Sequence, residues 1–341
     1  MKVARLYDSS DIRFEEEPLP QVGPGEALVR TRACGICSGD VMGWYMKKKA
    51  PLVFGHEPAG EVIEVGPGVT DFHPGDRVFV HHHAPCFTCR ACQRGEFVQC
   101  ATWRASRIVP GGMAEYFLVP KENLSGDTLQ LPDDLSFADG SLIEPTACVV
   151  KSLRKSGLHA GERVFIIGLG IMGQLHVALA RHAGAENIIG TDFVPYRREK
   201  ALQLGADLAL DPAQGNIEDQ LRDYTKGEMA EIVIVGPGSI EAMELGIRCT
   251  AKGGTVVFFT TSTPEARLPI SPYYLYFNEI SLTPSYSCGP NDTREALRFI
   301  REGIVTAEKF ITHRFPFSAL HEAYRTAADA RDSIKTVVEF S

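Results

Sequence analysis

Three residues of the chain, Cys37, His56 and Glu57, could together hold a metal ion and leave one position on it open. A thiolate, an imidazole and a carboxylate are ligands that zinc accepts, and three protein ligands leave the fourth position for water or a substrate. A cysteine or histidine taken alone is more often a core or turn residue. The metal interpretation therefore depends on the chemistry that the rest of the chain indicates.

Four further cysteines follow the spacing C-x2-C-x2-C-x7-C: Cys86, Cys89, Cys92 and Cys100. A short lobe, over about residues 84–102, could wrap these thiolates around a tetrahedral zinc at about 2.3 Å. Such a shell is saturated, so this metal would hold the lobe together and perform no chemistry. The same thiolates could instead hold an iron–sulfur cluster or remain free.

The number of cysteines favours metal binding over disulfides. The chain has 9 Cys, an odd number, and the crowding of four of them indicates metal ligands in a reducing compartment. Three histidines directly precede the four-cysteine segment: His81, His82 and His83. Because four thiolates already saturate a zinc ion, we expect these histidines to lie at the end of a strand.

A glycine-rich turn, G-L-G-I-M-G, follows an apolar β-type run and opens an amphipathic helical pattern. Gly168 permits the tight turn, Gly170 lets the backbone approach a pyrophosphate, and Gly173 allows the helix to pack closely. The N-terminus of the helix, with Ile171 and Met172 in its first turn, would face the phosphates. A strand, turn and helix in this order predict a dinucleotide-binding site.

Asp192 ends the next β-type run, where an acidic residue commonly binds the ribose hydroxyls and repels a 2′-phosphate. The sequence therefore favours NAD over NADP. Arg197 and Arg198 follow closely and could hold a 2′-phosphate, although Asp192 would then have to tolerate that charge. Asp192 could also be a plain turn residue.

The chain has 341 residues, enough for two domains. Over residues 3–116, short β-type runs alternate with Gly and Pro turns, which predicts an all-β, barrel-like domain. Further along, strands alternate with helices, as in a parallel sheet built from βαβ units. We expect a catalytic domain over residues 1–148, a dinucleotide-binding domain over 149–289, and a C-terminal segment, 290–341, that returns to the first domain.

Individual elements can be placed within these domains. Strands are predicted in the first domain at 27–31, 60–65, 77–80 and 114–119, and in the second at 164–167, 188–191, 208–210, 232–235, 255–259 and 280–283. Six strands suit a dinucleotide-binding sheet. The C-terminal segment is predicted to form helices at 293–302 and 318–328 and a last strand at 336–340.

The charge balance argues against nucleic acid and membrane surfaces as partners. With 35 Lys and Arg against 43 Asp and Glu, the net charge is −8 and no basic block is present. Arg90 and Arg94 are too few cations to give the four-cysteine lobe a phosphate-binding surface. No apolar stretch approaches the roughly 18 residues of a membrane span, and the N-terminus does not resemble a signal peptide. We therefore expect a cytoplasmic protein.

Several short motifs occur in a characteristic order: Gly35-Ile36-Cys37, Gly55-His56-Glu57, the four cysteines, Gly112-Met113-Ala114-Glu115-Tyr116, Leu142-Ile143-Glu144-Pro145, the glycine-rich turn and Ile311-Thr312-His313-Arg314-Phe315-Pro316. Over nearly its whole length the chain resembles zinc-containing medium-chain dehydrogenases/reductases of the sorbitol and threonine dehydrogenase branch. The resemblance implies a GroES-like β-barrel catalytic domain, a Rossmann domain with a doubly wound parallel sheet, an active-site zinc between them, and a homodimer or homotetramer.

The resemblance also implies roles around the catalytic zinc. By position, Cys37, His56 and Glu57 would be its ligands. Glu144 would approach the metal from the domain junction, as an alternative ligand or through a bound water, unless it is a structural helix cap. Asp40 matches the family aspartate that hydrogen-bonds the imidazole ligand, although it could be a simple turn residue.

The resemblance extends to the cofactor. Arg197 matches a cofactor-binding position of the family. Thr260, Thr261 and Ser285 fall where loops of the family usually meet the nicotinamide. These residues add to the NAD site expected from the glycine-rich turn and Asp192.

One departure from the family pattern concerns proton transfer. Family members usually have a Ser or Thr two residues after the cysteine ligand, where its hydroxyl relays the substrate proton, but this chain has Gly39 there and Ser38 before it. A histidine common five residues after the cysteine is replaced by Met42. Either Ser38 takes over through a shifted loop, or a water and Glu144 carry the proton. We favour the water and Glu144, since one residue along a turn redirects a side chain by a large angle.

These features together predict a zinc- and NAD-dependent dehydrogenase. It would oxidise a secondary alcohol on a polyol, sugar, cyclitol or hydroxy-amino acid by reversible hydride transfer, with two zinc ions per chain. Two alternatives on the same fold remain. One is a zinc-independent double-bond reductase, and the other is a binding protein that senses NAD without turnover.

Overall fold

The computed structural model describes residues 1–341 and divides into two compact units. The first unit contains Met1–Ala147 and Cys288–Ser341, and the second contains Cys148–Ser287. The C-terminal segment is thus part of the first unit. No helix combines the length and apolar character that crossing a bilayer requires.

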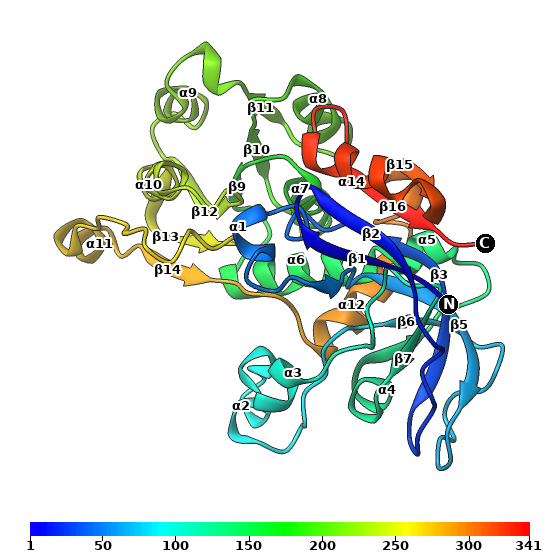
Figure 1. The fold of residues 1–341 in the computed structure, drawn as a ribbon. Coiled ribbons are helices and arrows are strands. Elements are labelled where there is room, and N and C mark those ends of the chain that lie inside the picture. Colours follow the sequence, from blue (N-terminus) through cyan, green and yellow to red (C-terminus); the bar gives the residue numbers. More distant parts are fainter. The chain divides into compact units, whose positions relative to one another are not determined.

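A seven-stranded sheet organises the first unit (Figure 1). Six of its strands follow the order β15-β16-β3-β5-β6-β8, and β7 pairs with β3; a separate sheet has the order β2-β1-β4. The strands are β1 Lys2–Asp8, β2 Asp11–Glu16, β3 Ala27–Gly35, β4 Leu52–Val53, β5 Pro58–Val65, β6 Arg77–Val80, β7 Tyr116–Val119, β8 Thr128–Gln130, β15 Ile311–Pro316 and β16 Lys335–Glu339.

The predicted strands of the first unit are present as β3, β5, β6 and β7, with some ends shifted. Strand β3 is almost entirely buried because β5, β7 and β16 all pair with it, which makes it the central strand. The predicted last strand is β16. Its antiparallel register sets Val337 opposite Gly35, and so brings the end of the chain beside the end of β3.

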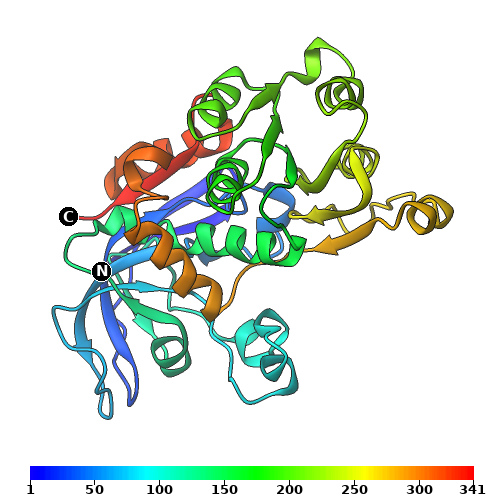
Figure 2. The same ribbon diagram turned by 180° about the vertical axis from the view of Figure 1, so that it is seen from behind.

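The helices of the first unit are short and lie outside the sheets. They are α1 Gly43–Met46, α2 Arg90–Gln93, α3 Ala101–Ala105, α4 Lys121–Asp127, α5 Phe137–Gly140, α12 Pro290–Arg301, α13 Ala307–Phe310 and α14 Leu320–Asp329, with 3-10 turns η1 Phe97–Gln99 and η3 Phe317–Ala319. Helices α12 and α14 correspond to the two predicted in the C-terminal segment. Helix α12 packs against α4, as the view from behind shows (Figure 2).

The second unit is a six-stranded parallel sheet with the order β11-β10-β9-β12-β13-β14. Its elements are β9 Arg163–Ile167, α7 Ile171–His182, β10 Asn187–Thr191, α8 Pro195–Gln203, β11 Leu208–Leu210, η2 Pro212–Gln214, α9 Ile217–Tyr224, β12 Ala230–Val235, α10 Ile240–Arg248, β13 Thr250–Phe258, α11 Pro272–Asn278 and β14 Ser281–Pro284. Helix α6, Ile143–Ser156, begins in the first unit and ends in the second.

This strand order confirms the predicted dinucleotide-binding sheet, because it is the 3-2-1-4-5-6 order of the doubly wound fold. All six predicted strands are present. Strands β9 and β12 are buried along nearly their whole length, which accounts for their continuous apolar runs. In such sheets, ligands bind at the carboxyl ends of the strands where the strand order reverses, here between β9 and β12.

Candidate metal centres and dinucleotide site

The three residues predicted to hold a catalytic metal converge in the first unit. Cys37 follows the end of β3, whereas His56 and Glu57 directly precede β5. The two strands are antiparallel neighbours with Cys34 opposite Pro58, so the end of one lies beside the start of the other. The ligand atoms of Cys37, His56 and Glu57 all lie within 4.8 Å of one another.

Asp40 connects two of these residues. Its Oδ1 lies 3.4 Å from Nδ1 of His56, and its Oδ2 accepts a hydrogen bond of 3.1 Å from the backbone N–H of Cys37. The side chain is buried, and its own carbonyl accepts a hydrogen bond from the Tyr324 hydroxyl. Burial would lower the pKa of His56, but Asp40 and Cys37 outweigh it and hold that pKa well above its usual value. Asp40 therefore lies where it can orient the imidazole.

Glu57 is buried and incompletely paired. Its Oε2 forms an ion pair with Lys335, whose Nζ also donates to the carbonyl of Ile36, but neither carboxylate oxygen has a well-aligned hydrogen bond. Burial raises the pKa of Glu57 even though Lys335 acts in the opposite direction. An unsatisfied buried oxygen costs free energy, and a cation beside Cys37 and His56 would relieve that cost. The three residues therefore fit a metal ion.

Glu144 lies in a different cluster from Cys37, His56 and Glu57. Its carboxylate, Nε2 of His81 and Sγ of Cys288 lie within 4.8 Å of one another, and all three residues are buried. His81 Nε2 is 3.6 Å from the Cys288 sulfur, and its Nδ1 is 2.8 Å from Asp127 Oδ2. Burial is the main influence on the pKa of Glu57 and raises it, and the charge of Glu144 adds to this increase.

Sequence reasoning missed two members of this surrounding structure, Cys288 and Lys335. No local motif marks either residue, because each meets its partners only through the return of the C-terminal segment. The three histidines do follow β6, as predicted. His81, however, is a buried part of the polar cluster and not only a residue at a strand end.

At Gly39, the position of the family's proton-relay hydroxyl, the structure has space for a side chain. A Cβ added to Gly39 would meet only the Cys37 sulfur, at 3.6 Å. Ser38 is exposed in the same turn. The neighbouring Met42 is the N-cap of α1 and is half-buried.

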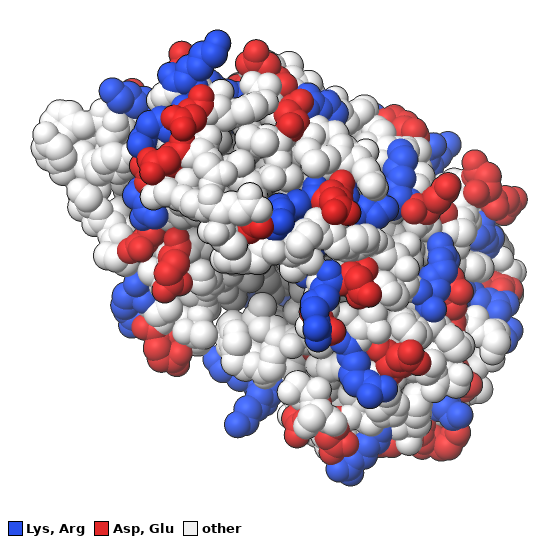
Figure 3. Space-filling view, turned by 90° about the horizontal axis from the view of Figure 1, so that it is seen from above, with Lys and Arg blue, Asp and Glu red and all other residues white.

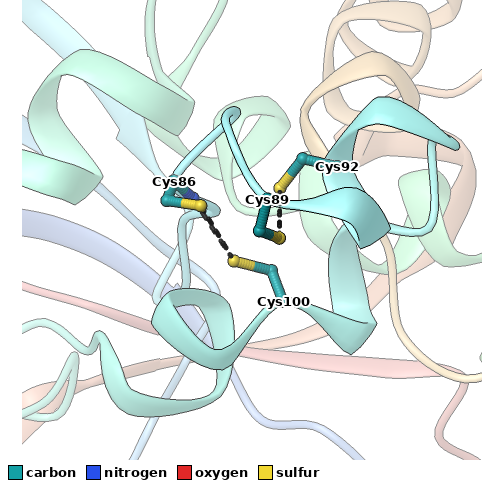
Figure 4. A group of neighbouring side chains, drawn as sticks. All are labelled: Cys86, Cys89, Cys92 and Cys100. Atoms are coloured by element: carbon teal, nitrogen blue, oxygen red, sulfur yellow. Dashed lines mark hydrogen bonds between the residues drawn. The ribbon is translucent and has the colours of Figure 1, made fainter.

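The four cysteines of the lobe point their sulfurs toward one another (Figure 4). The Cys86 and Cys100 sulfurs are 3.6 Å apart, and those of Cys89 and Cys92 are 3.5 Å apart. All four are free thiols. A tetrahedral shell with 2.3 Å bonds would separate its sulfurs by about 3.8 Å, so the thiols are nearly in place for a zinc ion.

The surroundings of these thiols act on them unequally, since burial raises the pKa of Cys92 to about 12. The hydroxyl of Thr88 donates to the Cys86 sulfur at 3.4 Å and, with nearby backbone N–H groups, lowers the pKa of Cys86 to about 5. Besides the cysteines, the buried apolar cluster of the lobe contains only Val98 and Trp103, with Phe97 packed against it. So small a cluster cannot stabilise the lobe by itself, which supports a bound ion.

In the second unit, the glycine-rich turn has the backbone that a dinucleotide requires. Gly168 has a φ of +90°, and a Cβ on Gly173 would lie 2.1 Å from the Gly168 carbonyl oxygen. Gly170 caps α7, and a Cβ there would meet no atom closer than 3.9 Å. The space above Gly170 is therefore open to a ligand. In the first turn, Ile171 is buried and Met172 half-buried, so their backbone N–H groups are the parts available to phosphate.

Asp192 stabilises the glycine-rich turn through hydrogen bonds and can still accept a further one. Its two oxygens accept hydrogen bonds of 2.8 Å from the backbone N–H groups of Leu169 and Val194. A carboxylate oxygen accepts up to two hydrogen bonds, so Oδ1 can still accept one from a ribose hydroxyl, whereas Oδ2 also accepts a hydrogen bond of 3.4 Å from Nη1 of Arg197. Arg197 lies 3.4 Å from Asp192 and has a buried Nε without a partner, whereas Arg198 is bound to Asp211 and to backbone carbonyls.

The remaining predicted cofactor residues lie after the carboxyl ends of two neighbouring strands. Thr260 and Thr261 follow β13, and Ser285 directly follows β14. The Ser285 hydroxyl is buried without a partner, and its backbone N–H donates to Phe258. Thr261 is exposed, and its hydroxyl donates to the carbonyl of Ser262. The unit therefore offers unsatisfied polar groups at the edge where a dinucleotide would bind.

The packing around Glu57 leads to a prediction about Gly35. A Cβ at this position would lie 1.8 Å from Glu57 Oε2 and 2.8 Å from Cε of Lys335. We expect Gly35→Ala to displace the carboxylate, to release the metal of the Cys37 set, and to lower the free energy of unfolding by about 1–3 kcal/mol through overpacking. Zinc analysis by atomic absorption and urea unfolding would measure both effects. Gly39→Ala is the matched control, and equal zinc content in the two variants would contradict the prediction.

Comparison with known proteins shows that both units of the chain are related to dehydrogenases. Residues 23–133 match the alcohol dehydrogenase GroES-like domain, and residues 172–302 match the zinc-binding dehydrogenase family. The L-galactonate-5-dehydrogenase of Escherichia coli (strain K12) is 31% identical, over 100% of this chain and 99% of that protein. The sorbitol dehydrogenase of Bombyx mori is 30% identical, over 94% of this chain and 93% of that protein.

A solved structure agrees with these relatives. A provisionally assigned zinc-binding dehydrogenase from Sinorhizobium meliloti 1021, bound to NADP, has a TM-score of 0.88 and 28% identity, over 99% of this chain and 98% of that one. The predicted combination of a GroES-like domain with a Rossmann sheet is confirmed. Because the matches cover both units, the chain belongs to the zinc-containing medium-chain dehydrogenases/reductases, in the sorbitol dehydrogenase branch.

Proposed function

We propose that the protein oxidises a secondary alcohol of a polyhydroxy compound to a ketone, with zinc and NAD, in a reversible reaction. The observation that carries this proposal is the buried carboxylate of Glu57 beside Cys37 and His56, whose Oε1 has no partner, in a chain that also has a glycine-rich turn ready for a dinucleotide. The relatives named for sorbitol and L-galactonate act, by those names, on compounds with several hydroxyl groups.

The residues of the metal set have distinct roles in this proposal. Cys37, His56 and Glu57 would hold the zinc, which supplies a Lewis acid that favours loss of the hydroxyl proton. Asp40 fixes the orientation of His56, and Lys335 holds one oxygen of Glu57. Asp40 and Lys335 thus restrict the movement of the metal ligands before the ion binds. This reduces the entropy that is lost when the ion binds.

The second unit would hold the cofactor. The backbone of the glycine-rich turn and the N-terminus of α7 would bind the pyrophosphate, and Asp192 would accept hydrogen bonds from the ribose. The nicotinamide supplies the hydride acceptor. Arg197 and Ser285, which both have buried atoms without partners, would contact the cofactor, as would Thr260 and Thr261.

Proton transfer must proceed without a hydroxyl at position 39. Ser38 is exposed and has no hydrogen bond to the metal set. We retain a water and Glu144 as the proton route, because Glu144 is buried and its carboxylate belongs to a polar cluster with His81 and Cys288. The four-cysteine lobe would hold a structural zinc with no part in the reaction.

We also propose that the protein forms a homo-oligomer through α11 and β14. Helix α11 exposes Tyr273, Tyr276 and Phe277, and β14 is the edge strand of its sheet. In Figure 3 the protruding part that contains α11 carries neither blue nor red side chains. Elsewhere on the visible face, positively and negatively charged side chains are interspersed. An exposed aromatic surface next to an open sheet edge favours contact with a second copy.

The two proposed zinc sites predict opposite results of cysteine substitution. We expect Cys37→Ala to lower kcat about a thousandfold while the protein remains folded, since a Lewis acid is worth several kcal/mol and each 1.36 kcal/mol is tenfold. Cys86→Ala should instead lower the melting temperature, because the lobe has little apolar packing. Zinc content, NADH formation from sorbitol and calorimetry would test this. Undiminished activity of Cys37→Ala in metal-free buffer would contradict the mechanism.

The cofactor assignment predicts a preference for NAD that depends on Asp192. We expect Asp192→Asn to reduce the ratio of kcat/KM for NAD over NADP about tenfold, since the variant loses both a ribose acceptor and the charge that repels a 2′-phosphate. Asp207→Asn is the matched control, because Asp207 also accepts a backbone N–H in this unit, that of Ile188. A wild-type preference for NADP would contradict the assignment.

The oligomer proposal predicts that charge on α11 separates the subunits. We expect the double variant Tyr276→Glu/Phe277→Glu to elute as a monomer in size-exclusion chromatography with light scattering, because carboxylates would be buried in the contact. Tyr224→Glu, on exposed α9, should leave the mass unchanged. A monomeric wild type, or an oligomer that survives the double substitution, would contradict the proposal.

A further inference from the structure

Three consecutive histidines after β6 have three different environments. His81 is fully buried and uses both ring nitrogens, toward Asp127 and Cys288. His83 interacts through Nδ1 with the carbonyl of Ser106, and its ring centroid lies 4.3 Å from that of Trp103. Both residues therefore have at least one hydrogen-bond partner in the protein.

His82 has no such role. Its ring centroid lies 5.0 Å from that of His56 and 4.1 Å from that of His83, but neither ring nitrogen forms a hydrogen bond, and Nδ1 is buried without a partner. The residue as a whole is half-exposed, as is His56. The imidazole of His82 thus lies beside His56, one of the proposed metal ligands, and forms no hydrogen bond.

Nδ1 of His82 is enclosed by protein, so the ring can meet a ligand only through Nε2, which is not among the buried atoms without a partner. A neutral imidazole has one N–H donor and one acceptor nitrogen, and a hydroxyl group can also donate and accept. The contacts with His56 and His83 hold the His82 ring in place. The ring can therefore bind a ligand group whose position is fixed by the metal site.

We propose that His82 binds a second hydroxyl of the substrate, on the carbon next to the one that is oxidised. The proposal rests on the proposed function, in which the reacting hydroxyl binds beside Cys37, His56 and Glu57. A hydroxyl on the adjacent carbon then comes close to a side chain that borders His56. His82 accordingly selects vicinal diols over simple secondary alcohols.

The chemistry explains why such a contact would discriminate. A site that hydrogen-bonds a substrate hydroxyl rejects an analogue without it, because the polar group of the protein is then left unpaired. An apolar wall would accept both compounds. The preference for a diol should therefore depend on His82 and be lost when His82 is replaced by an apolar residue.

The test measures equilibrium binding, which does not need turnover. Zinc-loaded protein without NAD is titrated by calorimetry with 2,3-butanediol and with 2-butanol, which differ by one hydroxyl. We expect the wild type to bind the diol about tenfold more tightly, the worth of one good hydrogen bond. His82→Ala should bind the two alcohols equally, and His82→Asn, which keeps a polar group, should recover part of the preference.

The matched control is His83→Ala, which loses the contacts with Ser106 and Trp103 but should keep the preference for the diol. A wild type without preference, or a preference that persists in His82→Ala, overturns the proposal. Kinetics with NAD and the same alcohols then separates the two hypotheses. If the diol preference depends on His82 but no NADH forms, the inference about His82 stands and the proposed dehydrogenase function fails.

Discussion

The buried ion pair between Glu57 and Lys335 is the interaction on which the candidate metal site depends. Both side chains are almost completely removed from solvent, and a buried carboxylate without a counter-charge would be strongly destabilising. Lys335 reaches Glu57 because β16 pairs with β3, and Gly35 leaves the space in which the two charges meet. The last strand of the chain is therefore needed to complete a site whose presumptive ligands all lie within its first sixty residues.

In the second unit, the main constraint on the candidate site is the space that a dinucleotide needs to approach the backbone. A dinucleotide can approach the backbone only where no Cβ intervenes, and Gly168, Gly170 and Gly173 provide this through φ, open space and close helix packing respectively. Asp192 then fixes the turn through two backbone hydrogen bonds. The same carboxylate is thus both a structural support of the turn and a candidate for contact with the ribose, two roles that sequence reasoning treated as alternatives.

What could be predicted from the sequence was local. The strand pattern, the glycine-rich turn and the spacing of the four cysteines lie within short segments, and the resemblance to a known family added the convergence of Cys37 with His56. The contacts of Lys335, of Cys288 with His81, and of His82 with His56 could not be predicted in this way. They join residues from different segments, and in the first two cases from opposite ends of the chain, so neither periodicity nor spacing encodes them. The three histidines show the limit clearly, since identical neighbours in sequence have three separate environments.

The lobe with the four cysteines has a consequence for the synthesis of the protein. Its apolar cluster is too small to drive folding, whereas the sheets of both units have large cores of their own. If the four cysteines hold zinc as proposed, the supply of metal during biosynthesis would determine whether this segment matures. Under metal starvation the cell would accumulate molecules with well-formed sheets and a loose, protease-sensitive lobe, and the yield of intact protein would follow the supply of the ion.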